Sequence, residues 1–355
     1  MLDSLVFIAA YCTISKILFD SDTWLNLLFG TYGTMNNTTV LVSPFTKDDI
    51  YKTLYDWVGL TYPVLILLFG TLGNCLNFFI LGRACPGTSI AVLLRSMAIA
   101  NLVDIWFYIF PLWMRVTFGV KLKESSRLAC KVIPFINYTG TDCAIFLVVL
   151  SNLDRFVAIW FPMKMSKFCN TKNALMETLL AFVFSVLINI TAPLTKSILS
   201  DGSCDTEKNW LYNYQTYVHP WIIFALVSVT PEIAVILLNS CIACGIFRHN
   251  KMMRDMTVRT ITTRNAATNR SSAAFKNDSA TLVLTLGISL MFVVLYTPIL
   301  LLNSFESQFS NKRLFRVISI VFSMLQHTFH SIDFYIYLGI STSYRRKFLK
   351  VMCNK

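Results

Sequence analysis

The sequence has few charged residues, and this scarcity limits what the protein can be. Asp, Glu, Lys and Arg make up 14% of the 355 residues, whereas about a quarter of the residues in a soluble domain are charged. Apolar residues make up 55% of the chain and gather in runs long enough to cross a bilayer. This composition excludes an ordinary soluble enzyme and predicts an all-α membrane protein.

Two further absences narrow the class of membrane protein. The 10 cysteines do not stand at metal-binding spacings with the 4 histidines, so we expect no metal centre and no cofactor held by them. Cys241 and Cys244 lie at an apolar helix end, where the packing of small side chains explains them. The sequence also shows no internal repeat, which a seven-helix transporter built from two related halves would tend to show.

Seven runs carry at most two charged residues each and are long enough to span a membrane as helices. The runs are Trp57–Gly82, Ala91–Trp113, Val132–Leu153, Ala174–Leu194, Val218–Phe247, Ala280–Asn303 and Val317–Leu338. An odd number of spans places the two ends of the chain on opposite sides of the membrane. We therefore predict a seven-transmembrane helix bundle over residues 56–340, with residues 341–355 following it.

The distribution of basic residues predicts the orientation of the bundle. If the N-terminus is extracellular, the inner segments hold 18 of the 31 Lys and Arg residues, as the positive-inside rule requires. The glycosylation sequons at Asn36 and Asn37 fit an extracellular segment over residues 1–55. The start of that segment resembles a short signal-peptide core, although Asp3 replaces the usual basic residue. The net charge of +12 then reflects the inner face and not a nucleic-acid partner.

Short motifs follow one another along the seven runs. They are Gly73-Asn74, "MAIANL" at Met97–Leu102, "LDRF" at Leu153–Phe156, Pro231, "FVVLYTP" at Phe292–Pro298 and "DFYIY" at Asp333–Tyr337. Cys130 lies 25 residues before Arg155, which in a helix separates them by ~37 Å and places them on opposite sides of the membrane. Together the motifs resemble those of rhodopsin-like (class A) G-protein-coupled receptors. The last one is similar to the form found in invertebrate neuropeptide receptors of the FMRFamide type.

This resemblance implies a disulfide and two switches. Cys130 and Cys204 match the pair that links helix 3 to the second outer loop of the family. The G-protein switch would consist of Asp154, Arg155, Asp278 and Tyr337, with Arg155 and Asp278 paired at rest; the alternative is that Asp278 is a solvated loop charge. The helix-6 switch would consist of Phe292, Tyr296 and Pro298.

The end of the chain matches a further family feature. Tyr344–Phe348 resembles the start of a short amphipathic eighth helix. Cys353 follows this basic, amphipathic segment, where lipidation would anchor the helix to the membrane surface; a free cysteine is the alternative.

The intramembrane polar pair departs from the family in an ordered way. Where the family usually has Asp in helix 2 and Asn in helix 7, this chain has Asn101 and Asp333, so the pair looks exchanged. Asn74 and water would complete the site, or the group would be a hydrogen-bonded cluster that holds helices 1, 2 and 7 together. A sodium ion could bind beside Asp333, but Ala144 replaces the serine that usually supplies a ligand.

The candidate ligand pocket excludes two ligand classes. Asn137 stands where amine receptors carry the Asp that binds the ammonium group, and no Lys lies between Lys312 and Lys347 to hold a retinal. A peptide or a neutral small molecule remains. The candidate pocket residues are Asp104, Asn137, Asp142, Tyr296 and His327. Alternatively, the intramembrane acids, with Glu232 among them, have partners inside the protein, for example His327 or His330 for Asp104.

We therefore expect a plasma-membrane receptor that is not an enzyme. It would bind an extracellular ligand, and the resemblance favours a neuropeptide. Ligand binding would shift the receptor toward a conformation that activates a heterotrimeric G protein. Two other functions remain open at this stage. One is a receptor-like protein that binds a ligand without signalling, for which the altered motifs leave room, and the other is a seven-helix transporter.

Overall fold

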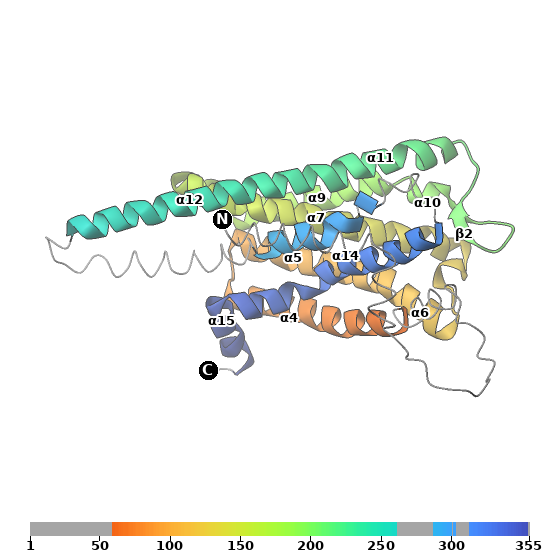
Figure 1. The fold of residues 1–355 in the computed structure, drawn as a ribbon, viewed down its shortest axis with the longest axis horizontal. Coiled ribbons are helices and arrows are strands. Elements are labelled where there is room, and N and C mark those ends of the chain that lie inside the picture. The colour runs from red at the N-terminus through yellow and green to blue at the C-terminus, as the bar shows by residue number, and fades with distance from the viewer. Residues whose placement is uncertain (1–58, 261–286, 300, 303–311, 354–355) are drawn as a thin grey trace, which may run out of the picture. The chain divides into compact units, whose positions relative to one another are not determined.

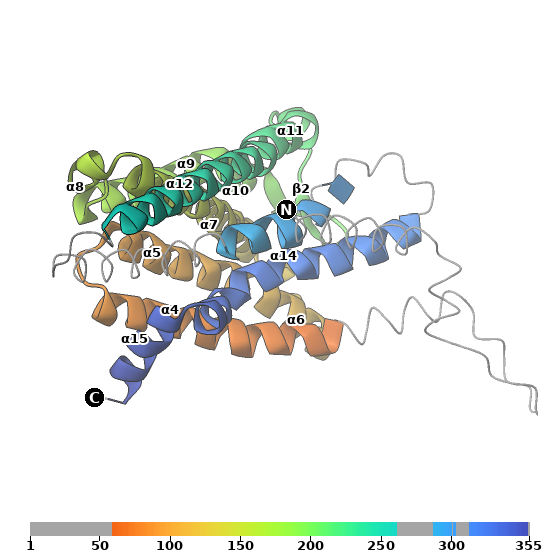
Figure 2. The same cartoon turned by 60° about the vertical axis from the view of Figure 1, so that its left-hand side comes forward.

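The computed structural model describes residues 59–260, 287–299, 301–302 and 312–353 (Figure 1). Its described part is a bundle of long helices that run alongside one another, with a short two-stranded hairpin at one end (Figures 1 and 2). We call the end with the hairpin the outer end, following the orientation predicted from the sequence. The opposite end, from which α15 (Thr342–Met352) extends, is the inner end.

Five helical segments of the described chain are long and apolar enough to cross a membrane: Gly59–Ala84, Ser89–Phe118, Arg127–Trp160, Thr171–Thr195 and Tyr214–Arg248. The labelled helices within them are α4 (Thr71–Ala84), α5 (Ser89–Asp104), α6 (Phe110–Phe118), α7 (Arg127–Trp160), α9 (Thr171–Asn189), α10 (Ala192–Thr195), α11 (His219–Ile223) and α12 (Thr230–Thr260). The helix Gly287–Ile299 and α14 (Lys312–Ile340) follow. The rest of the predicted sixth run lies outside the described residues.

Several helices extend beyond the apolar runs that predict them. The helix α7 begins at Arg127, where the Ser126 hydroxyl accepts a hydrogen bond from the backbone N–H of Ala129 at 3.0 Å. The side chain of Asn170 accepts from Asn173 N in the same way at the start of α9. Such capping satisfies backbone donors at a helix end, so a helix continues into polar sequence beyond the hydrocarbon of the bilayer.

The core of the bundle is apolar and lies between α4, α5, α7, α14 and the helix Gly287–Ile299. Its largest fully buried side chains include Met97, Leu147, Phe292 and Phe329. The outward faces also carry large apolar side chains, and Leu187 on α9 is 62% exposed. A bilayer covers such surfaces, so their exposure agrees with a membrane-spanning bundle.

The inner end is completed by α15. Ser341 caps this helix by accepting from Tyr344 N at 3.1 Å, and Tyr344 is buried against Phe334 and Tyr337. The Tyr344 hydroxyl donates to Asn77 Oδ1 on α4 at 2.6 Å. The predicted amphipathic eighth helix is therefore present, and its apolar face packs on the bundle.

Gly140 on α7 lies where α5 and α7 approach each other closely. A Cβ atom at this position would lie 2.4 Å from Val103 Cγ1 and 2.9 Å from Val103 Cβ. Val103 is β-branched and therefore stiff, so the two helices could not keep their separation with a larger residue at position 140. Gly339 on α14 differs, because a Cβ atom there meets no described atom within 4 Å.

We expect Gly140→Ala to destabilise the protein by about 1–3 kcal/mol through overpacking. Gly339→Ala is the matched control and should change stability by no more than about 0.5 kcal/mol. The measurement is the melting temperature of each purified variant in the same detergent. Equal melting temperatures for the two variants would show that α5 and α7 are not held at the distance described above.

Candidate functional site

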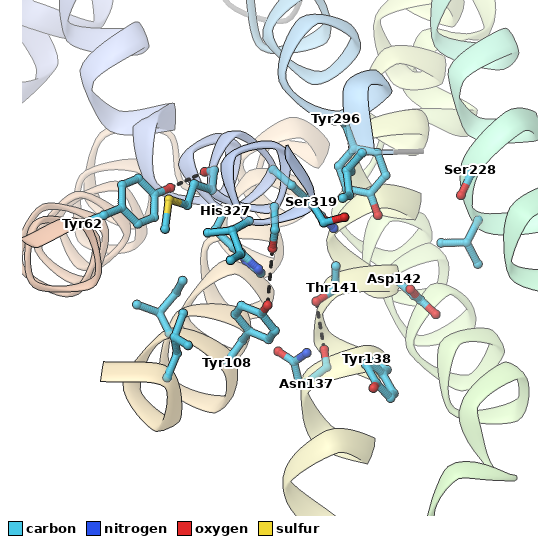
Figure 3. Close-up of a pocket in the computed structure, with 18 of the residues that line it drawn as sticks. Tyr62, Tyr108, Asn137, Tyr138, Thr141, Asp142, Ser228, Tyr296, Ser319 and His327 are labelled. Atoms are coloured by element: carbon cyan, nitrogen blue, oxygen red, sulfur yellow. Dashed lines mark hydrogen bonds between the residues drawn. The ribbon is translucent and has the colours of Figure 1, made fainter. Parts of the chain in front are cut away.

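A cavity of about 510 Å³ opens between the helices in the outer half of the bundle (Figure 3). Its polar lining comes from six helical segments and consists of Tyr62, Tyr108, Asn137, Tyr138, Thr141, Asp142, Ser228, Tyr296, Ser319, Ser323, Gln326 and His327. Four of the five residues predicted to contact a ligand, Asn137, Asp142, Tyr296 and His327, therefore lie around one cavity. A cavity of this size suits a small molecule or the end of a peptide.

Asp104, the fifth predicted pocket residue, is fully buried next to the cavity. His327 Nδ1 donates to its Oδ2 atom at 2.7 Å, and Thr141 Oγ1 donates to its Oδ1 atom at 2.8 Å. The ring of Tyr108 stacks on His327 with 4.1 Å between the ring centroids. Asp104 therefore has an internal partner, which was the predicted alternative to ligand contact. Its carboxylate orients His327 and Thr141, two residues of the cavity wall.

A second polar group lies deeper in the bundle. Asn101 Nδ2 donates to Asp333 Oδ2 at 2.9 Å and to Asn74 Oδ1 at 3.2 Å. His330 Nδ1 donates to Asn101 Oδ1 at 2.8 Å, so this histidine contacts Asn101 and forms no hydrogen bond with Asp104. The side chains of the supposed exchanged pair are thus direct neighbours that join α5 to α14.

These residues do not fit a sodium ion well. Hard cations bind several oxygen ligands at once. The amide oxygens of Asn74 and Asn101 already accept hydrogen bonds, and Ala144 offers no side-chain oxygen. Asp333 Oδ1 is buried without a hydrogen-bond partner among the described residues, so one carboxylate oxygen alone remains from the group of Asn74, Asn101 and Asp333.

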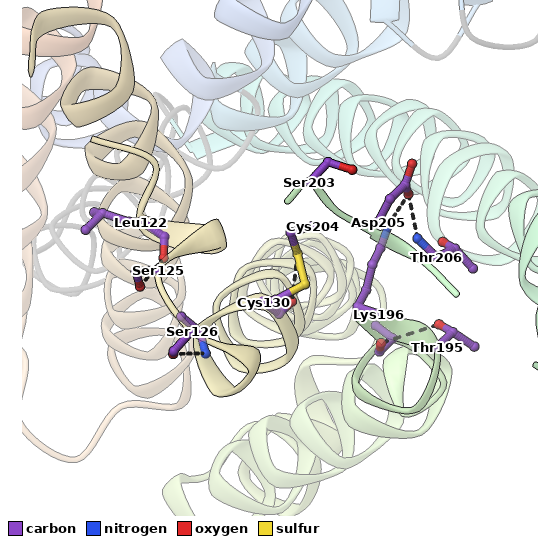
Figure 4. Close-up of a disulfide and its surroundings, with 12 residues drawn as sticks. Leu122, Ser125, Ser126, Cys130, Thr195, Lys196, Ser203, Cys204, Asp205 and Thr206 are labelled. Atoms are coloured by element: carbon purple, nitrogen blue, oxygen red, sulfur yellow. Dashed lines mark hydrogen bonds and ion pairs between the residues drawn. A yellow bond between two sulfur atoms is a disulfide. The ribbon is translucent and has the colours of Figure 1, made fainter. Parts of the chain in front are cut away.

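The outer end is fastened by the disulfide between Cys130 and Cys204, whose Cα atoms lie 5.6 Å apart (Figure 4). It joins the start of α7 to the hairpin of β1 (Lys196–Ile198) and β2 (Cys204–Thr206). Lys196 pairs with Asp205 across the hairpin at 3.1 Å. The Thr206 backbone N–H and the Lys196 ammonium hold the pKa of Asp205 below its usual value.

The hairpin also forms the wall of a second cavity of about 590 Å³, to which Lys196, Asp205 and Thr206 contribute. Tyr138 and Asp142 line both cavities. Ile223 and Ser228 also line both cavities, so the two spaces are neighbours.

At the inner end, Asp154 is the centre of a buried polar contact. Its Oδ2 atom accepts from Arg155 Nη2 at 2.9 Å, and its Oδ1 atom accepts from Ser89 Oγ at 2.6 Å. Asp154 and Arg155 are 7% and 8% exposed. Asp278, the predicted resting partner of Arg155, lies outside the described residues, as do Asn36 and Asn37. Cys353 is exposed directly after α15.

Two residues of the predicted helix-6 switch, Phe292 and Tyr296, contact each other directly. Phe292 and Tyr296 are stacked with 5.2 Å between ring centroids, and Phe292 also packs edge-on against Phe329 of α14. Tyr296 lines the cavity, and Pro298 is buried one half-turn further on. Tyr337, the other predicted switch residue, is 1% exposed and contacts the ring of Tyr344.

Sequence reasoning missed the neutral partners of three acids inside the bundle. Asn189 donates to Asp142 at 2.6 Å, Thr297 donates to Glu232 at 2.6 Å, and Ser89 donates to Asp154. Each of the three donors is a single polar residue in or beside an apolar run. A polar residue at such a place needs a partner, and this is the only signal in the sequence that could have indicated these contacts.

We expect Cys130→Ser to lower the free energy of unfolding by about 2–5 kcal/mol, because the disulfide constrains the unfolded chain. Cys241→Ser, at an exposed free cysteine, is the control and should have little effect. Peptide mapping of non-reduced protein should recover Cys130 linked to Cys204. Alkylation of both thiols without reduction would contradict the arrangement of the outer loop.

We expect the effects of exchanging Asn101 and Asp333 to be coupled. Asn101→Asp places two carboxylates in contact in a low-dielectric site and should lose stability. Asp333→Asn leaves two amides and no charge, so its stability should change less. The double variant restores one acid and one amide. Thermal unfolding of the purified variants should give a coupling energy of about 0.5–3 kcal/mol.

A second pair serves as the control for this cycle. Glu232 shares no partner with Asp333, so Glu232→Gln combined with Asp333→Asn should be additive. Additivity in the Asn101 and Asp333 cycle itself would mean that the two side chains do not form the contact at 2.9 Å.

Comparison with known proteins identifies the family. The family model "7 transmembrane receptor (rhodopsin family)" matches residues 74–337. "Probable G-protein coupled receptor B0563.6" of Caenorhabditis elegans is 21% identical over 310 residues, which is 82% of this chain and 68% of that protein.

Two further relatives match over shorter lengths. The allatostatin-A receptor of Bombyx mori is 24% identical over 51% of this chain and 46% of its own length. Sex peptide receptor-related protein 2 of Caenorhabditis elegans is 28% identical over 50% of this chain and 37% of its own length. This chain therefore spans about half or less of these two relatives. The relatives include receptors named for neuropeptides but do not single out the FMRFamide type.

The chain belongs to the rhodopsin family of seven-transmembrane, G-protein-coupled receptors, and it is a multi-pass membrane protein.

Proposed function

We propose that this receptor binds an extracellular peptide in the outer cavities and activates a heterotrimeric G protein at its inner end. The observation that carries the proposal is the pair of cavities, of about 510 and 590 Å³, that meet at Tyr138 and Asp142. Two adjoining spaces, one walled by the hairpin, suit an extended chain better than a single small molecule. The names of the allatostatin-A and sex-peptide relatives support a peptide ligand.

The proposal assigns a role to each part of the chain. Residues 1–55 form the extracellular N-terminal segment, residues 56–340 the transmembrane domain, and residues 341–355 the cytoplasmic eighth helix and tail. The receptor acts at the plasma membrane, with Asn36 and Asn37 as glycosylation sites and Cys353 as a lipidation site on the inner side.

A chain of contacts supports communication between the cavity and the inner end. Tyr296 of the cavity wall stacks on Phe292, and Ser289, one turn further on, donates to Asn152 Oδ1 on α7 at 2.9 Å. Asn152 precedes Arg155 by three residues and so lies on the same face of α7. A ligand that moves Tyr296 therefore alters a helix contact close to Arg155.

The resting state is held in this proposal by the contacts of Asp154. Its carboxylate binds Arg155 and Ser89 together, and this arrangement ties the inner end of α7 to the start of α5. Ligand binding favours the state in which Arg155 is released to meet the G protein, because a ligand shifts a conformational equilibrium by its differential affinity for the two states.

We expect Asp154→Asn to raise basal nucleotide exchange on a G protein, because the amide holds Arg155 less strongly than the carboxylate does. If the ion pair contributes about 1.4 kcal/mol to the resting state, the active fraction rises about tenfold. Ser89→Ala is the comparison and should give a smaller rise, since it removes a neutral donor.

The measurement is binding of a non-hydrolysable GTP analogue by a panel of purified G proteins, with receptor in lipid nanodiscs. Unchanged or lower exchange for Asp154→Asn at equal amounts of folded receptor would contradict the resting contact. Failure of every G protein to respond, with or without a screened peptide library, would favour a receptor-like binder that does not signal.

A further inference from the structure

Asp142 has a surrounding unlike that of any other acid in the described spans. It is 6% exposed, and its Oδ2 atom accepts from Asn189 Nδ2 at 2.6 Å. The described residues form no hydrogen bond to its Oδ1 atom and no ion pair with either oxygen. Its side chain lines both outer cavities. Asp142 is thus a carboxylate with one neutral partner and one side that faces open space.

A comparison with four other acids inside the bundle shows what Asp142 lacks. Asp104 is paired with His327, and Asp154 is paired with Arg155. Glu232 and Asp333, like Asp142, have only a hydroxyl or an amide as partner, but neither lines the two outer cavities. Among these five acids, Asp142 alone combines the lack of a cation with access to those cavities.

An uncompensated carboxylate in a membrane span carries a large desolvation penalty. One hydrogen bond from an amide offsets part of that penalty but supplies no charge. A partner that supplies the missing charge would therefore come from outside the described chain, and the cavities are the route by which a cationic group could reach Asp142.

The neighbouring groups suit a cation that carries several N–H donors. Asn137 lines the first cavity, and its Oδ1 atom is buried without a hydrogen-bond partner among the described residues. Tyr138 and Tyr296 offer aromatic faces beside the same space (Figure 3), and cations bind favourably over such faces. A guanidinium group can donate to a carboxylate and to a further acceptor at the same time.

We propose that Asp142 binds a guanidinium or ammonium group of the ligand, and that the ligand continues from this point into both cavities. The proposal rests on the receptor function proposed above and adds the chemistry of its ligand. An Arg or Lys side chain, or the amino group at the start of a peptide, would meet this requirement.

The test uses two probes of the same shape and different charge, Nα-acetylarginine amide and Nα-acetylcitrulline amide. The melting temperature of purified, full-length receptor is measured with each probe at increasing concentration. At concentrations well above its dissociation constant, the arginine probe should raise the melting temperature by about 2–4 °C, and the citrulline probe should leave it unchanged. Nα-acetyllysine amide distinguishes a general cation site from one that requires a guanidinium.

Two variants show whether the effect depends on Asp142. Asp142→Asn should abolish the shift caused by the arginine probe. Glu232→Gln, which removes an acid that does not line the two outer cavities, should retain it. Equal shifts with both probes, persistence of the shift in Asp142→Asn, or no shift in the unaltered receptor would each overturn the proposal.

The stability of the ligand-free variants gives an independent measurement. Because a buried charge without a counterion destabilises the free receptor, Asp142→Asn should leave its melting temperature unchanged or raise it. A clear fall, matched by Asn189→Leu, would mean that the two side chains form a structural pair and would overturn the proposal. None of these measurements involves a G protein. If the cation site fails these tests but the receptor still stimulates nucleotide exchange, only the cation site is rejected and the receptor function stands.

Discussion

The hydrogen bond from Asn101 to Asp333 joins α5 to α14 at a place where neither side chain can turn to water. Asn101 is fully buried and Asp333 is 1% exposed. The hydrogen bond between them therefore offsets part of the free-energy cost of removing each group from water. Asn74 and His330 bond to the same amide, which brings α4 into the contact. Because polar groups in a membrane core have few other partners, this group fixes the relative rotation of three helices. The cavity walls on α7 and α14 are built around that arrangement.

The seven spans could be predicted because the bilayer imposes a length and a polarity that leave a clear mark on the sequence. The disulfide, the eighth helix and the neighbourhood of Asn101 and Asp333 followed from the resemblance, since the family motifs carry the register of each helix. The helix ends were less predictable. Capping at Ser126 and Asn170 extends α7 and α9 beyond their apolar runs, and hydropathy does not contain that information.

The sequence named His327 as one possible partner of Asp104 but could not decide which partner each buried acid has, because that depends on the rotation of one helix against another. Asn189 reaches Asp142 across the interface of α9 and α7, and His327 reaches Asp104 from α14. An error of one residue in register turns a side chain by about 100° around a helix. The sequence could therefore name the acids of the pocket and the alternatives for each, but it could not decide which acid has a partner of its own chain.

That decision matters because the acids divide by the charge of their partners. Where a carboxylate meets a cation of the same chain, as Asp154 meets Arg155, the pair has no charge left to offer. Where a carboxylate meets only an amide beside open space, as Asp142 does, the protein retains an electrostatic cost that a ligand can relieve. In the cation site proposed for Asp142, the ligand would gain binding energy by relieving this cost, as expected if function is placed at sites that are not optimised for stability. The same reasoning separates a ligand-contacting acid from a structural one in any helix bundle, because it depends on the partner and the cavity and not on the position of the acid in the sequence.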